Sequence, residues 1–260
     1  MKRKNLVLAI GTSLYSGKFY REVAASWRGR AFVYVLLLLV ICSLFTTTKL
    51  MTGFVGWFND FSSVVVPQIP VVTFKQGVAT TKAQKPYYIK YDQAFMVVDT
   101  GNQIKDFQSN PDLVLILKSD RVSIKKNSGE IRTYYFRKNM TGAVGPQVIQ
   151  KLIYKYKIIF FIVASIGIYL FMVGFAYAGY LLFALFAALL SMIYSAAMKR
   201  RLDYGALLSL ALIVLTPIIL LRTIIFLTGI GIRLGFIPAL VIVLVYLFFA
   251  VKANPKKEST

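Results

Sequence analysis

The sequence contains no histidine and a single cysteine, Cys42. Without an imidazole, the chain cannot build a His-based catalytic triad, a His-ligated zinc site, a haem site with a His ligand or an imidazole proton relay. One thiol forms neither an internal disulfide nor a thiolate metal site within one chain. We therefore expect no cofactor and no metal, and we interpret Cys42 as a small apolar residue.

Charged residues are also scarce, at 16% of the chain, whereas 57% of the residues are apolar. An uncharged apolar run near 20 residues matches a helix that crosses a hydrocarbon layer of roughly 30 Å. The composition therefore predicts an α-helical integral membrane protein. Runs without Asp, Glu, Lys or Arg cover residues 31–48, 158–198, 204–221 and 234–251.

The run 158–198 is about twice the length of one membrane-crossing helix. Because small residues gather between Gly174 and Gly179 near its middle, we expect a turn there and two helices. The prediction is about five spans, at residues 31–48, 158–177, 179–198, 204–226 and 234–251.

The remaining segments suggest a division into domains. Residues 1–30 form a basic amphipathic lead, and residues 49–70 read as an amphipathic linker helix that ends at Pro67. Residues 71–145 are rich in β-branched and aromatic residues and predict a small antiparallel β domain, an α+β insertion between the first two spans. Residues 146–260 should form a four-span helical bundle that starts at Pro146.

The net charge of +21 is spread over the whole chain. It divides into +6 for residues 1–30, +9 for residues 48–157 and +6 for residues 158–260. The basic residues are dispersed, so we expect anionic membrane lipids as partners and no nucleic acid. The basic lead favours a cytoplasmic N-terminus and an extracytoplasmic β domain. Five spans would then place Lys199, Arg200 and Arg201 outside, against the positive-inside rule, so the side of the C-terminus stays open.

The stretch "AFMVVDTGNQI", residues 94–104, resembles the active-site strand of an aspartic protease. Such an enzyme needs two carboxylates that share a proton, so one Asp-Thr-Gly could act only in a homodimer. The glycines that follow Gly101 are isolated and supply no flap. We interpret Asp99 and Gly101 as a turn at the end of a strand, where Asp bonds to its own turn backbone. The dimeric protease is a remote alternative.

Two arginines, Arg222 and Arg233, flank the segment "TIIFLTGIGI" between the last two spans. One interpretation is that both lie at helix ends and extend to lipid head groups. The other is that they bind a lipid phosphate, another anion or a partner carboxylate, because charges within a membrane are costly and usually functional. Pro217 should kink its span, and small residues such as Gly167 allow close packing or a homo-oligomer.

The chain resembles a bacterial family of uncharacterised membrane proteins, DUF1189. The resemblance rests on the lead "FYREVAASWRGRAFVYVLLLL" with Trp27-Arg28-Gly29, and on "FKQGVAT" and "FMVVDTGNQI" with Asp99-Thr100. The helical part is also similar, more weakly, to Yip1-like membrane proteins. The resemblance implies a multi-pass protein of the bacterial cytoplasmic membrane and gives no catalytic residue.

From these observations we expect a non-enzymatic membrane protein. It would act as an adaptor or regulator that contacts envelope or transporter proteins through its extracytoplasmic domain. The alternative is a lipid-handling or transport role that uses Arg222 and Arg233.

Overall fold

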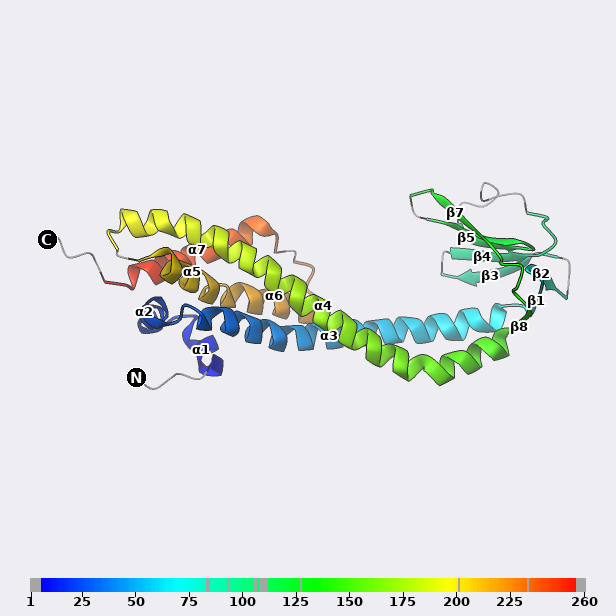
Figure 1. Cartoon of the computed structure of the whole chain (residues 1–260), viewed down its shortest axis with the longest axis horizontal. Coiled ribbons are helices and arrows are strands. Elements are labelled where there is room, and N and C mark those ends of the chain that lie inside the picture. The colour runs from blue at the N-terminus through cyan, green and yellow to red at the C-terminus, as the bar shows by residue number, and fades with distance from the viewer. Residues whose placement is uncertain are drawn as a thin grey trace. The chain divides into compact units, whose positions relative to one another are not determined.

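The computed structural model describes residues 6–82, 85–92, 94–104, 107, 112–126, 128–200, 202–232 and 234–255. The chain forms two compact units. Residues 1–51 and 164–260 make up the helical unit, and residues 52–163 make up the β unit. Two long helices contribute to both units (Figure 1).

Most of the described residues are helical. The α-helices are α1 (Leu6–Thr12), α2 (Gly17–Ser26), α3 (Arg30–Val65), α4 (Pro146–Ala197), α5 (Tyr204–Ile213), α6 (Thr216–Thr228) and α7 (Phe236–Lys252). A short 3-10 helix, η1 (Val66–Gln68), follows α3 and contains Pro67. The described ranges include three helical segments long and apolar enough to cross a membrane, namely Arg30–Gln68, Pro146–Ala197 and Tyr204–Thr228, and the shorter apolar helix α7.

Helix α4 corrects the expected number of spans. The predicted turn between Gly174 and Gly179 is wrong, because α4 continues through both residues without a break. A glycine in a helix costs about 1 kcal/mol relative to alanine but keeps its backbone hydrogen bonds. A turn in this apolar stretch would leave several backbone groups without partners, which costs far more. The separate spans 158–177 and 179–198 are therefore one helix.

Helix α3 corrects a second boundary. The sequence suggested a span at residues 31–48 followed by a separate linker helix at 49–70, but α3 runs unbroken to Val65. The helix ends where the sequence predicted, just before Pro67, whose ring cannot continue an α-helix. The expected strand-rich segment begins shortly after it.

Pro217 lies where the sequence predicted a kink. Helix α5 ends at Ile213 and α6 begins at Thr216, so Pro217 occupies the first turn of α6. A proline is tolerated there because the first amide groups of a helix have no partner within the helix. The predicted span 204–226 is thus two short helices in series.

The core of the helical unit is built around Trp27, which is fully buried. Phe19 and Tyr34 contact its ring edge to face, with ring centroids 5.1 and 6.2 Å away. The hydroxyl of Tyr34 lies 2.8 Å from that of Thr216, which ties α3 to α6. The amphipathic lead is therefore part of the packed core of the helical unit.

The β unit contains two sheets (Figure 1). The three-stranded sheet has the order β2-β1-β8, and the five-stranded sheet has the order β3-β4-β5-β6-β7. The strands are β1 (Val72–Lys75), β2 (Val78–Thr81), β3 (Tyr87–Tyr91), β4 (Ala94–Asp99), β5 (Leu113–Lys118), β6 (Arg121–Lys125), β7 (Ile131–Tyr135) and β8 (Gly142–Val144).

Most neighbouring strands pair antiparallel, as predicted, and tight turns join them. Gln76 and Gly77 connect β1 to β2 with φ of 49° and 81°, the left-handed pair that a two-residue hairpin needs. Ser119 and Asp120 connect the antiparallel strands β5 and β6. The exception is β4, which pairs parallel with β5, so the expectation of a purely antiparallel domain is wrong for this pair.

Candidate functional site

A groove lies on the helical unit between α4, α6 and α7, with a volume of about 640 Å³. Its wall is almost entirely apolar. On α4, Ala176 and Gly179 face a hollow, and a side chain added at Gly179 would meet no atom within 4 Å. The other lining residues are Phe175, Tyr180, Leu182, Phe183, Phe186, Ile218, Arg222, Phe236 and Ala239.

Among the residues that the structure describes, Arg222 is the one charged residue that lines this groove. Its guanidinium donates to the carbonyl of Leu234 at 3.2 Å and to the hydroxyl of Tyr180 at 3.5 Å. It also lies over the Tyr180 ring, 6.0 Å from the centroid. Both partners are neutral, and the sequence has no acidic residue between Asp203 and Glu258. Arg222 is therefore a cation in an apolar groove that contacts no carboxylate within the described part of the chain.

The other arginine expected in this region, Arg233, lies outside the described residues. The described polar groups of the groove are therefore those of Arg222 and Tyr180. The sequence alone did not single out Tyr180. Tyr180 directly follows Gly179, and only the packing of α4 against α6 shows that it meets Arg222.

The contacts of Lys49 show where Arg222 lies along α6. Its ammonium donates to the carbonyls of Phe226 and Leu227 at 2.8 and 2.7 Å, at the end of α6. Lys49 directly follows the uncharged run 31–48 of α3, so it marks one end of that apolar stretch. Arg222 precedes Phe226 by four residues, about one helical turn. Arg222 therefore lies about one helical turn from the carbonyls that Lys49 contacts, near one end of the uncharged run of α3.

A cluster of basic residues joins three segments at the opposite end of α3. Arg28 in the lead pairs with Asp203 at 2.9 Å. Arg21 donates to the carbonyl of Ala253 at 2.5 Å, and Arg200 donates to the carbonyl of Asn254. The lead, the segment between α4 and α5, and the end of α7 therefore meet at one end of the helical unit (Figure 1).

Tyr20 lies beside this cluster and donates a hydrogen bond to the carbonyl of Ser13. Burial raises the pKa of its phenol well above the usual value, because the charged phenolate would lose its hydration. Tyr20 is therefore neutral at physiological pH and acts as a structural hydrogen-bond donor.

Asp99 ends strand β4 and is fully buried, with a relative exposure of 0%. Its Oδ2 accepts a hydrogen bond from the backbone of Ile104 at 2.6 Å, and its carbonyl accepts one from Asn102 at 3.3 Å. Asn102 has the left-handed φ of 56° in this turn, next to Gly101. The side chain thus bonds its own turn, as the turn interpretation expects, and the dimeric-protease alternative would require this carboxylate to become exposed.

One edge of the five-stranded sheet is formed by β7, whose five residues are all exposed. Hydrogen bonds from Phe136 to Asp120 and from Lys126 to Glu130, both 2.9 Å, fix how β7 pairs with β6. In an antiparallel pair the bonded residues alternate with residues whose amide and carbonyl groups point the other way. Therefore Ile131, Thr133 and Tyr135 direct their backbone groups away from the sheet.

The opposite edge, formed by β3, is closed by a side chain. The amide of Gln68 accepts from the Lys90 backbone N–H at 3.0 Å and donates to the Lys90 carbonyl at 3.2 Å. Gln68 thereby takes the place of a neighbouring strand at Lys90, near the end of β3. Among the described residues, no side chain bonds the outward backbone groups of β7 in this way, so β3 is a closed edge and β7 an open one.

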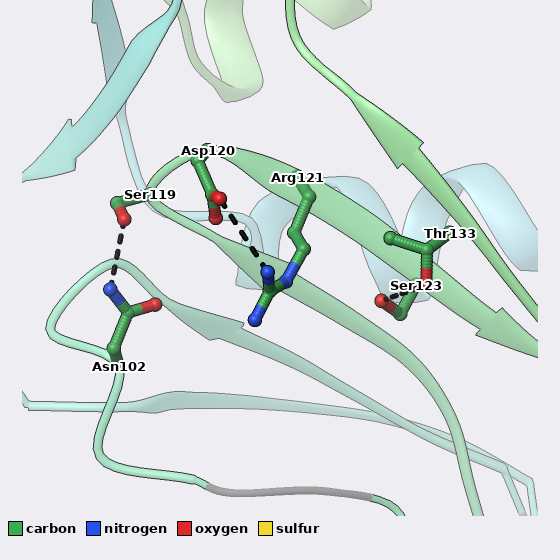
Figure 2. A network of polar contacts seen from close by, with 6 residues as sticks. All are labelled: Asn102, Ser119, Asp120, Arg121, Ser123 and Thr133. Carbon is green, nitrogen blue, oxygen red and sulfur yellow. Dashed lines mark hydrogen bonds and ion pairs between the residues drawn. The ribbon is translucent and has the colours of Figure 1, made fainter.

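Figure 2 shows the polar side chains that surround the start of β6. Asn102 donates to the Ser119 hydroxyl at 2.9 Å, and Arg121 pairs with Asp120 at 3.6 Å. The hydroxyl groups of Ser123 and Thr133 lie 3.0 Å apart across β6 and β7. The contact between Ser123 and Thr133 holds β7 on β6 through side chains as well as through the backbone.

Within the described part of the chain, no group of three or more Cys, Asp or Glu residues could hold a metal ion. The candidate sites are therefore the groove with Arg222 and the open edge at β7. Both sites offer groups that can bind a partner. The groove presents a guanidinium next to an apolar surface, and the β7 edge presents a row of backbone donors and acceptors.

No curated protein and no solved structure matches the chain. The model of one protein family, described as a protein of unknown function, DUF1189, matches residues 9–251. This range includes the lead from α1 onward, both sheets of the β unit and nearly all of α7, so it covers both candidate sites. The chain therefore belongs to the DUF1189 family.

Proposed function

We propose that the protein is a non-enzymatic membrane adaptor whose β unit binds an extended, acidic segment of an envelope or transporter protein along strand β7. The observation that carries the proposal is the contrast between the closed edge at β3 and the open edge at β7. An exposed edge with outward backbone groups accepts an added strand, and main-chain hydrogen bonds provide the affinity.

The charge and side chains of β7 define the partner. Arg121, Lys125 and Arg132 lie on β6 and β7, and residues 48–157 carry a net charge of +9. Tyr134 and Tyr135 are 53% and 68% exposed and offer aromatic surface on the two faces of the strand. An extended segment with acidic and apolar residues complements this edge, whereas a second copy of the chain would bring further positive charge.

We further propose four membrane crossings, with both ends of the chain in the cytoplasm of a bacterial cell. The crossings are α3, α4, the pair α5 and α6, and α7. The contacts of Arg21, Arg28 and Arg200 support this arrangement, because they join the lead, the segment after α4 and the end of α7. Four crossings put all of these basic residues on one side and remove the conflict with the positive-inside rule that five spans create. The β unit is then extracytoplasmic, since it follows the far end of α3.

The test uses the full-length protein in its native membrane with a photoreactive phenylalanine analogue in place of Tyr135. We expect one cross-linked protein, joined through an extended segment with a net negative charge. Thr133→Pro should reduce this product at least tenfold, because proline removes the outward N–H of β7. Proline is tolerated there because the lost N–H does not bond to β6.

Thr133→Ala is the matched control, since it removes the contact with Ser123 but keeps the N–H. It should keep the cross-link. Equal cross-linking in the proline and alanine variants, both folded by circular dichroism, would refute the proposed edge. A product that contains only a second copy of this chain would replace the proposed partner with self-association.

A further inference from the structure

The second candidate site suggests a ligand of its own. We propose that the groove between α4, α6 and α7 binds one anionic phospholipid, whose phosphate contacts Arg222 and whose acyl chain lies along the aromatic wall. The proposal does not depend on the partner proposed for β7, because the two sites lie in different units.

The argument begins with the charge of Arg222. A guanidinium has five N–H donors in a planar fork that matches a phosphate. Arg222 uses donors on a neutral carbonyl and on a neutral hydroxyl, at 3.2 and 3.5 Å. These bonds do not neutralise its charge, and the sequence offers no carboxylate from Tyr204 to Lys257. An anion from outside the chain is therefore the complementary partner.

The surface around Arg222 decides what kind of anion fits. The groove is lined mainly by aromatic and aliphatic side chains, including Phe175, Phe183 and Phe236. A free phosphate ion would leave this surface exposed, whereas an acyl chain would cover it. A volume of about 640 Å³ is in the range of sites that hold a small ligand or part of a lipid.

The position of Arg222 along the helix agrees with a head group. It lies about one helical turn from the carbonyls that Lys49 contacts, and Lys49 follows the uncharged run of α3. Lipid phosphates lie at this boundary between the apolar layer and water. Under the four-crossing arrangement, the lipid belongs to the leaflet that faces the β unit.

Small residues on α4 leave room for the groove. Ala176 and Gly179 lie in its wall, and the space in front of Gly179 is empty to 4 Å. Gly179 has ordinary helical backbone, so a larger side chain there occupies the groove without straining the helix. Gly167, also on α4, has open space too and does not line the groove, which makes it a matched control position.

The experiment compares two phospholipids with identical acyl chains, phosphatidylglycerol and phosphatidylcholine, on the delipidated full-length protein. Native mass spectrometry gives the apparent Kd for each lipid. We expect phosphatidylglycerol to bind at least tenfold more tightly. Arg222→Ala should abolish this preference, and Arg222→Lys should keep part of it because the charge remains while the planar fork is lost.

Gly179→Leu should weaken both lipids at least fivefold by filling the groove, whereas Gly167→Leu should change neither. A tenfold preference that survives in Arg222→Ala would overturn the proposal, as would equal effects of the two leucine variants. Arg222→Lys and Gly167→Leu should retain the thermal midpoint of the unmodified protein. Their midpoints are the references against which the folding of Arg222→Ala and Gly179→Leu is judged.

Discussion

Lysine and arginine side chains differ in their main partners between the two units. In the helical unit, Arg21, Lys49, Arg200 and Arg222 donate to backbone carbonyls, and Arg28 forms an exposed ion pair with Asp203. In the β unit, Arg121, Lys126 and Arg132 form ion pairs with acidic side chains. The difference follows from composition, because residues 158–260 contain only two acidic residues. Where carboxylates are scarce, backbone carbonyls take their place, and those at the C-terminal ends of α6 and α7 carry the partial negative charge of the helix.

The largest expected effect comes from a substitution in the core of the helical unit. Trp27 is fully buried, and Trp57, the second tryptophan, is 50% exposed in the β unit. We expect Trp27→Ala to lower the free energy of unfolding by about 3–5 kcal/mol, the usual cost of removing a large buried aromatic side chain. Trp57→Ala should cost much less.

The two variants also separate the units spectroscopically, since each leaves one tryptophan as a fluorescent reporter. In the Trp27→Ala protein, the emission of Trp57 should show a β unit that still unfolds at its normal denaturant concentration. Simultaneous loss of both units would show that they do not unfold independently.

A cation that contacts carbonyls should contribute more than a surface ion pair does. Lys49→Ala removes two charge-assisted hydrogen bonds, at 2.8 and 2.7 Å, to the end of α6. We expect a loss of about 1–2 kcal/mol in unfolding free energy, because bonds to charged groups are stronger than neutral ones and solvent weakens exposed pairs. Detergent-based thermal unfolding measures the change. Lys49→Arg should recover most of it, and equal behaviour of the two variants would exclude charge as the cause.

A substitution at the closed edge of the β unit should have a smaller effect on stability, and this effect can be assigned to a single backbone N–H. Gln68→Ala should cost about 1 kcal/mol, the net value of a typical hydrogen-bonded contact. Hydrogen exchange should show the change directly, because the Lys90 N–H loses its partner and should exchange at least several times faster.

Gln68→Glu tests the same contact more finely. The carboxylate can still accept from the Lys90 N–H but cannot donate to the Lys90 carbonyl. Its exchange rate should fall between those of the alanine variant and the unmodified protein. An unchanged rate in the alanine variant would show that Gln68 does not protect this edge.

The smallest effect should come from the ion pair between Arg28 and Asp203. Their side chains are 69% and 56% exposed at a separation of 2.9 Å, so solvent weakens their attraction. A double-mutant cycle with Arg28→Ala and Asp203→Ala should give a coupling energy below about 1 kcal/mol. A larger value would mean that this pair, unlike other exposed pairs, fixes the lead on the bundle.

The sequence predicted the class of the fold well because the relevant signals are local. The uncharged runs and the proline at 67 each depend on neighbouring residues, and the structure agrees with them. It failed at Gly174 and Gly179, because run length and small residues do not distinguish one long helix from two short ones. That choice depends on where α4 packs, which no local pattern contains.

The candidate sites were predicted only in part. Arg222 was identifiable as a charge next to a span, but its groove requires α4 and α7, which are far from it in sequence. The open edge at β7 could not be predicted, because strand order depends on the parallel pairing of β4 with β5. A glutamine such as Gln68 carries no signal of its own until its distance from Lys90 is known.

The bond from Arg21 to the carbonyl of Ala253 has a consequence for biosynthesis. The two residues are 232 positions apart, so a ribosome adding 5–20 residues per second needs about 10–50 s to make the second after the first. During that interval the lead is present without its final neighbour. The lead can dock fully only when α7 has entered the bundle, so this contact is among the last to form.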